Sequence, residues 1–186
     1  MKKTVLILSA VAITGTMLFA PSCKKESNNA PAATPTLYDS LGGTAMVADP
    51  SNSGQMIEKG RLGIRSVVDS TIFVIAADTS LNKFFPVLLA EVTGSNLSGF
   101  TILSKNLTDF FCVATGAKNF TYAGKDMVAA HDPAQNPRMN GKSSNADFDQ
   151  FVADLVVGAK KVGLSDDLIG RVGRVVNTTR SSVVQK

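Results

Sequence analysis

The chain has 186 residues, a formal net charge of +4 and a hydrophobic content of 44%. A charge this small excludes the strongly basic surface that nucleic-acid-binding proteins present, so we expect no nucleic acid among its partners. The sequence contains only Cys23 and Cys112 as cysteines, which excludes a disulfide framework, and a chain of this length can hold one domain together by its core alone.

The N-terminal segment has the pattern of an export signal. Lys2 and Lys3 precede an uncharged apolar run over residues 5–20, and the Ala-Pro-Ser-Cys sequence that ends at Cys23 looks like a lipobox. The run is shorter than the roughly 20 residues that a membrane-spanning helix needs. We therefore expect a signal peptide over residues 1–22, cleavage before Cys23 and a lipid on that cysteine. The alternatives are an ordinary secretory peptide and an uncleaved anchor.

Residues 23–36 are polar and rich in proline and alanine, without apolar periodicity, and this composition is typical of a flexible tether. The expected organisation is therefore a signal peptide, a tether and one domain over residues 37–186. The protein would be exported and held by its lipid on the periplasmic side of a bacterial membrane or in the outer membrane. Loss of Lys2 and Lys3 on cleavage would lower the net charge to about +2.

Four stretches of the domain carry apolar residues at helical spacing. They cover residues 64–75, 103–114, 148–159 and 164–176. Gly116 is expected to end the second helix, Ser144 and Asp147 to form a capping box before the third, and Ser165 to cap the fourth. The alternation over residues 71–76 also permits a strand, but the longer pattern favours helix. Residues 48–60 and 132–144 are expected to be loops, because prolines and glycines interrupt them.

The single histidine, His131, restricts the chemistry that the chain can perform. Catalytic triads, two-histidine zinc sites and iron sites with two histidines are excluded. The commonest site built on one imidazole is haem iron held by a proximal histidine. An isolated surface or capping histidine is the ordinary alternative. Cys112 lies in an apolar run, which favours a buried small side chain over a reactive thiol.

The order of four motifs resembles the truncated haemoglobins, most closely their first group. The motifs are an opening Leu-Tyr-Asp-Ser-Leu-Gly-Gly, a helix that leads into a Phe-Phe corner, a Phe-Phe-Cys-Val-Ala-Thr-Gly-Ala segment, and a segment that ends at the histidine; they cover residues 37–43, 67–85, 110–117 and 122–131. The resemblance implies an all-α fold, a truncated globin with a two-over-two helical sandwich around haem b. It implies His131 as the iron ligand.

The same resemblance assigns further residues to the haem pocket. It places eight side chains against haem: Phe85, Leu103, Leu107, Phe110, Tyr122, Met127, Phe148 and Phe151. It places Thr71 and Ile72 on the distal side, where members of the group usually carry a tyrosine that donates a hydrogen bond to oxygen. With Ile72, Leu103 and Leu107 at the distal positions, an apolar distal pocket is expected.

Three functions stay open at this stage. The first is a haem protein that binds a diatomic gas such as oxygen, nitric oxide or carbon monoxide, with a redox partner of unknown identity. The second is a globin-fold lipoprotein without haem that serves as a binding or structural module. The third is a haem enzyme, a nitric oxide dioxygenase or a weak peroxidase. The retained His131 favours the first over the second, and the missing distal tyrosine disfavours the third, because dioxygenation starts from stably held oxygen.

Overall fold

The computed structural model describes residues 34–186. The expected signal peptide, the lipidated Cys23 and most of the tether lie outside the described residues. Within that part of the chain no helix is long and apolar enough to cross a bilayer. The secondary structure elements are α1 (Leu37–Ser40), β1 (Met46–Ala48), β2 (Met56–Glu58), α2 (Lys59–Ala77), η1 (Asn82–Phe84), α3 (Pro86–Thr93), α4 (Ser98–Ala114), α5 (Met127–His131), α6 (Asn145–Lys161), α7 (Asp166–Asn177) and α8 (Arg180–Val183).

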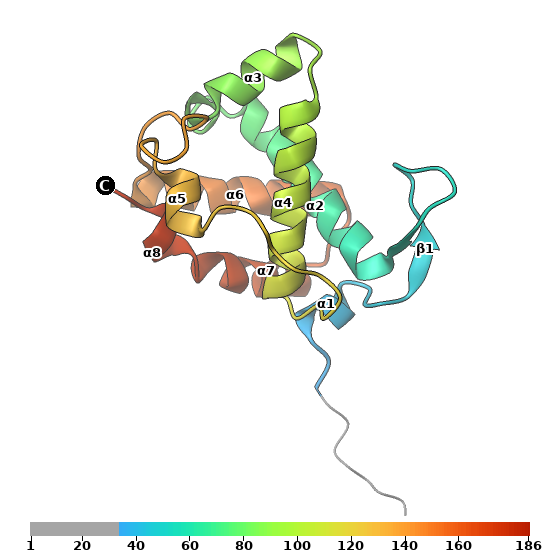
Figure 1. The fold of residues 1–186 in the computed structure, drawn as a ribbon. Coiled ribbons are helices and arrows are strands. Elements are labelled where there is room, and N and C mark those ends of the chain that lie inside the picture. Colours follow the sequence, from blue (N-terminus) through green and yellow to red (C-terminus); the bar gives the residue numbers. More distant parts are fainter. Residues whose placement is uncertain (1–33) are drawn as a thin grey trace, which may run out of the picture. The chain divides into compact units, whose positions relative to one another are not determined.

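The four predicted helices form two packed pairs. Helix α2 crosses α4 and also packs against α6, while α6 packs against α7 (Figure 1). One core cluster joins α2 to α6 and α7 through Val67, Leu155 and Val172, and a second joins α2 to α4 through Ile64 and Cys112. The expected two-over-two helical sandwich is confirmed. Residues 71–76 are helical, because Ile72 and its neighbours belong to the long apolar face that α2 buries.

The predicted helix ends are also observed. Ser144 and Asp147 form the capping box of α6, and the Ser165 hydroxyl accepts from the amide of Leu168 at the start of α7. Gly116 follows α4 with a φ of 100°, and the amide after it donates to the carbonyl of Cys112 over 2.9 Å. This pattern closes a helix through a left-handed residue, which glycine adopts without a steric penalty. The following chain therefore turns back along α4.

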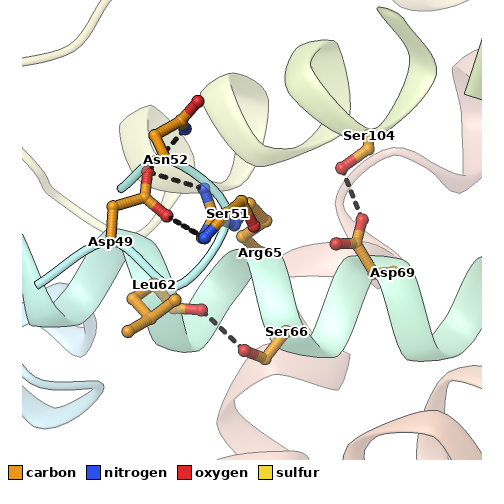
Figure 2. A network of polar contacts seen from close by, with 8 residues as sticks. All are labelled: Asp49, Ser51, Asn52, Leu62, Arg65, Ser66, Asp69 and Ser104. Atoms are coloured by element: carbon orange, nitrogen blue, oxygen red, sulfur yellow. Dashed lines mark hydrogen bonds and ion pairs between the residues drawn. The ribbon is translucent and has the colours of Figure 1, made fainter. Parts of the chain in front are cut away.

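The expected loop over residues 48–60 is wrong in part. Strands β1 and β2 pair antiparallel with Val47 opposite Ile57, and α2 begins at Lys59. Figure 2 shows Arg65 of α2 beside Asp49 of the hairpin turn. The guanidinium of Arg65 donates to both carboxylate oxygens of Asp49, with nitrogen–oxygen distances of 2.7 and 3.3 Å. Arg65 lowers the pKa of Asp49 well below its usual range. The hairpin is therefore held by tertiary contacts with α2, in addition to its own short ladder.

The segment after α2 contains an unpredicted helix, α3, which starts with Pro86 at its first position. Proline suits that position because the first amide of a helix has no intrahelical partner. The predicted loop over residues 132–144 is confirmed as irregular chain. This loop is tied to α3, because Arg138 donates twice to the Glu91 carboxylate over 2.6 and 2.8 Å. Asn140 also donates to the carbonyls of Lys83 and Phe84 over 3.0 Å each.

Helices α2 and α6 lie close together at Gly158. A Cβ atom at this position would lie 2.8 Å from both the Cα and the amide nitrogen of Thr71. Since those are backbone atoms, the two helices would have to separate, and Gly158→Ala should destabilise the fold by about 1–3 kcal/mol. Urea unfolding followed by circular dichroism measures the change. Gly173→Ala on α7 is the matched control, because nothing lies within 4 Å of its added Cβ. Equal stabilities of the two variants would contradict this account of the crossing.

Candidate functional site

A cavity of about 230 Å³ lies between the helices, and its walls are almost wholly apolar. Aromatic and aliphatic side chains from α2, η1, α3, α4, α5, α6, α7 and α8 line it. A concave apolar space of this kind, with a few polar groups in its lining, is the usual form of a cofactor or ligand site. His131 is among the lining residues.

The hydrogen bonding of His131 determines which ring nitrogen can bind a ligand. Its Nδ1 lies 2.8 Å from the carbonyl oxygen of Met127, one turn earlier on α5. A carbonyl oxygen can only accept, so Nδ1 carries the proton and Nε2 keeps its lone pair. No described residue forms a hydrogen bond with Nε2. Metal-binding histidines typically donate their second ring nitrogen in this way, which orients the ring and raises its basicity as a ligand.

The surroundings of His131 favour its neutral form. Desolvation by burial lowers the pKa of His131 below 6.5, and its bond to Met127 opposes that effect only in part. Since a metal ion competes with the proton for imidazole, a histidine that is already neutral at pH 7 is ready to bind one. The residue therefore has the protonation state and the tautomer of an iron ligand.

Helix α5 has only five residues, so contacts from other segments must hold it in place. The Asp126 carboxylate caps its N-terminus by accepting from the amide of Ala129 over 3.0 Å. At the other end, Asn136 donates to the carbonyl of Ala130 over 2.7 Å, and Gln185 donates to that of Val128 over 3.1 Å. These bonds fix His131 at the cavity wall.

The structure brings together most of the side chains that the sequence assigned to the pocket. The following line the cavity: Ile72, Phe85, Leu103, Leu107, Phe110, Met127, His131, Phe148 and Phe151. Tyr122 is not among the lining residues. Its hydroxyl donates to the carbonyl of Lys125 over 2.6 Å, and its ring packs edge-on against Phe110 at a centroid distance of 5.7 Å. Tyr122 thus packs against Phe110, which lines the cavity, without lining the cavity itself.

Thr71 also lies outside this cavity. Its hydroxyl donates to the carbonyl of Val67 over 2.8 Å, and the side chain faces a second, smaller cavity of about 50 Å³. The two cavities share lining residues, among them Ile72, Leu107 and Phe111. The hydroxyl of Thr71 is therefore committed to its own helix.

Sequence reasoning missed a group of lining residues. They are Phe73, Ile75, Leu81, Phe84, Leu88, Leu89, Val92, Phe100, Phe111, Val176 and Val183. Several come from α3 and the chain around it, where the run Val-Leu-Leu after Pro86 was the available signal. Met139, from the loop over residues 132–144, also lines the cavity. Phe84 is almost fully buried beneath this wall.

Cys112 is the cysteine that lies within the described residues, and it is separate from this cavity. Cys112 has 0% exposure, and burial raises the pKa of its thiol to about 11. The expectation of a buried, unreactive side chain is confirmed. Cys112 does not line the large cavity.

Comparison with known proteins places this geometry in context. No family model matches the sequence. The group 1 truncated haemoglobin of Tetrahymena thermophila is 32% identical over 83 residues, which cover 45% of this chain and 62% of that protein. The homologous protein of Tetrahymena pyriformis is 31% identical over the same length. The aligned part thus spans less than two thirds of these relatives.

Solved structures resemble the chain over a longer stretch. A single-substitution variant of the Tetrahymena pyriformis truncated haemoglobin in its Fe(III) form superposes with a TM-score of 0.58, at 22% identity. The 2/2 haemoglobin of Synechococcus, in the cyanomet state with covalently attached haem, superposes with a TM-score of 0.57 at the same identity. Each covers 82% of this chain and 100% of its own. The chain therefore has the two-over-two fold of the truncated haemoglobins, and sequence and structure together support its homology to them.

Proposed function

We propose that the protein binds haem in the large cavity, with Nε2 of His131 as the proximal iron ligand, and that it binds a diatomic gas there. The observation that carries this proposal is the bond from Nδ1 of His131 to the carbonyl of Met127, which leaves a neutral Nε2 at an apolar cavity. When bound, haem would supply an iron that can take a small diatomic ligand. The residues of the chain hold the group, orient the imidazole and exclude water.

The lining residues fit a flat, apolar group. Phe85, Phe110, Phe148 and Phe151 present aromatic rings, and Leu103 and Leu107 present branched aliphatic groups. Burial of such a group among these side chains would extend the apolar core. An absorption spectrum of the purified chain tests the proposal: we expect an intense Soret band with one haem per chain. A colourless protein that gains no Soret band when haem is added would refute it.

The cavity offers few hydrogen-bond donors to a bound gas. Among the described lining residues, Ser143 and Thr179 donate their hydroxyls to the carbonyls of Val183 and Val176 over 2.5 and 2.8 Å. Asp147 is an acceptor, because its bonds with Ser144 lower the pKa of its carboxyl. The side-chain amide of Asn82 has two N–H donors. One of them donates to the carbonyl of Ala76, and the other is available to a bound gas. We therefore propose that gases which need little hydrogen bonding, such as nitric oxide and carbon monoxide, bind more stably than oxygen.

The haem is expected to be of the b type and not covalently linked. A covalent thioether link needs a cysteine at the haem edge, and Cys112 is buried away from the cavity. Acidified organic solvent should therefore transfer all of the haem from the denatured chain into the organic phase. Haem that stays on the polypeptide in a denaturing gel would contradict this assignment.

We also propose that the mature protein begins at a lipid-modified Cys23 and is anchored to a membrane. The support is the sequence pattern alone: a basic start, an apolar run and a small residue before the cysteine. Mass spectrometry of the N-terminal peptide should show a diacylglyceryl group on Cys23, and Cys23→Ser should release the protein from the membrane fraction. An unmodified N-terminus at another residue would show an ordinary secretory peptide instead.

A further inference from the structure

Two carboxyl groups that the proposed haem site does not use, Asp78 and Asp154, lie within hydrogen-bonding reach of each other. Asp78 follows the last residue of α2, and Asp154 lies in the middle of α6, with only 5% of its surface exposed. One carboxyl oxygen of each, Oδ2, is buried and has no hydrogen-bond donor among the described residues. Two buried acceptors without a donor are costly, because each loses its hydration without replacement.

We propose that Asp78 and Asp154 share one proton, so that a carboxylic acid on one side donates to the carboxylate on the other. The proton would join the end of α2 to α6. A single hydrogen would satisfy both unpartnered oxygens and would remove the repulsion between two buried negative charges. Such a pair titrates as a unit, with the pKa of one carboxyl group raised above its ordinary value.

The charges around the pair leave no other source of neutralisation. Gln150 donates to Oδ1 of Asp154 over 3.2 Å, and the amide of Ser80 donates to Oδ1 of Asp78 over 2.8 Å. The cations of the elements packed against α6 are either paired with other residues or exposed: Arg61 with Asp109, Arg65 with Asp49, Lys83 with Asp147, Arg171 with Ser40, Arg180 with Asp149, and Lys59 and Arg174 in solvent. The acidic residues on the same elements are Asp69, Asp166 and Asp167, and they cannot neutralise the carboxyl pair.

The location of the pair gives it a structural consequence. The carbonyl of Asp78 accepts from the amides of Leu81 and Asn82 over 3.2 and 2.8 Å, so this residue organises the corner between α2 and η1. Leu81 and Asn82 line the large cavity, as does Phe151, which lies one turn before Asp154 on α6. Loss of the shared proton would repel Asp78 from α6 and loosen the corner that closes this part of the cavity.

The direction of the pH effect follows from the two pKa values. Desolvation and the charge of Asp78 raise the pKa of Asp154 above 3.8, whereas the amide of Ser80 lowers the pKa of Asp78. The contribution of Asp154 to stability is therefore complete below pH 3.8 and is lost as the pH rises to its raised folded value. Asp78 acts in the opposite sense, since its contribution is lost as the pH falls through its lowered value. The shared proton thus makes the corner between α2 and η1 more stable in mild acid than at alkaline pH.

The decisive variant is Asp154→Asn, whose amide keeps a hydrogen at every pH. The ratio of the unfolding constants, wild type over variant, should rise up to tenfold per pH unit from pH 3.8 to the raised pKa of Asp154, and then stay level. Asp167→Asn, an exposed change on α7, is the control and should show no such rise. Hydrogen exchange at the amides of Leu81 and Asn82 should show the same pH dependence relative to Asp154→Asn.

A direct measurement covers the case in which the variant does not fold. Carbon NMR of the aspartate carboxyl groups in the wild-type full chain should show that one carboxyl of the pair titrates above pH 3.8. In Asp78→Asn that resonance should titrate at a lower pH, because the neighbouring charge is gone. Ordinary titration of both carboxyls would overturn the proposal. So would a stability that depends on added sodium or calcium and not on pH, which would mean that a cation, and no proton, occupies the pair.

Discussion

Replacing His131 with alanine should abolish stoichiometric haem binding while the helical fold remains. His131 is the only imidazole in the sequence, and its hydrogen bond to Met127 leaves Nε2 unprotonated at the cavity. Loss of an outer-shell partner of a metal ligand typically costs about 10- to 100-fold in metal affinity, and loss of the ligand itself should cost more. Haem per chain, measured from the Soret band against protein concentration, should fall to a small fraction of the wild-type value.

Two controls separate ligation from folding in this experiment. Added imidazole should restore haem binding to His131→Ala, because it can occupy the space that the side chain leaves. Met127→Leu should keep its haem, since the acceptor for Nδ1 is the backbone carbonyl of residue 127 and not its side chain. A His131→Ala protein with the haem content and spectrum of the wild type would disprove the proximal assignment.

Introducing a hydroxyl at residue 72 should slow the release of oxygen. Ile72 is 8% exposed and lines the large cavity from α2, where no described hydroxyl is free to donate. A hydrogen bond to a ligand that carries partial negative charge contributes about 1–3 kcal/mol, so Ile72→Tyr should lower the oxygen dissociation rate by about ten- to hundredfold. Stopped-flow mixing of the oxygenated protein with excess carbon monoxide measures this rate.

Ile72→Phe is the matched control, because it adds the same ring without the hydroxyl. Carbon monoxide release should differ little between the two variants, since carbon monoxide depends less on a donor. If the tyrosine and phenylalanine variants release oxygen at the same rate, then either residue 72 does not face the gas or another group already donates. The wild-type protein is also expected to autoxidise readily.

The long helices were predictable because their evidence is local. Each of α2, α4, α6 and α7 repeats apolar residues over at least three turns, and capping residues such as Ser144 and Ser165 mark where two of them begin. Gly116 at the end of α4 needs a left-handed backbone whatever surrounds it. Such signals depend on neighbours within a few residues, so the sequence expresses them directly.

The short elements were not predictable, because tertiary contacts stabilise them. Strands β1 and β2 have three residues each, which is too few to show an alternation of apolar and polar residues. The hairpin is held to α2 by the hydrogen bond from Arg65 to the carboxylate of Asp49. Helix α3 has eight residues and no fully buried side chain, and Arg138 from a loop more than 40 residues later anchors it. The hairpin and α3 form because residues far away in the sequence contact them in the folded chain.

The features of the candidate site also fall into those that the sequence predicted and those that tertiary contacts decided. The sequence by itself limited any imidazole ligand to His131, because it contains a single histidine, and it predicted the four long helices that contribute part of the cavity wall. Only the tertiary structure decided the tautomer of His131, through the carbonyl of Met127, and the exclusion of Tyr122 and Thr71 from the cavity wall. Hydrogen-bond partners and cavity walls come from residues that are brought together only by packing, and no local pattern in the sequence specifies which side of a helix or loop will meet them.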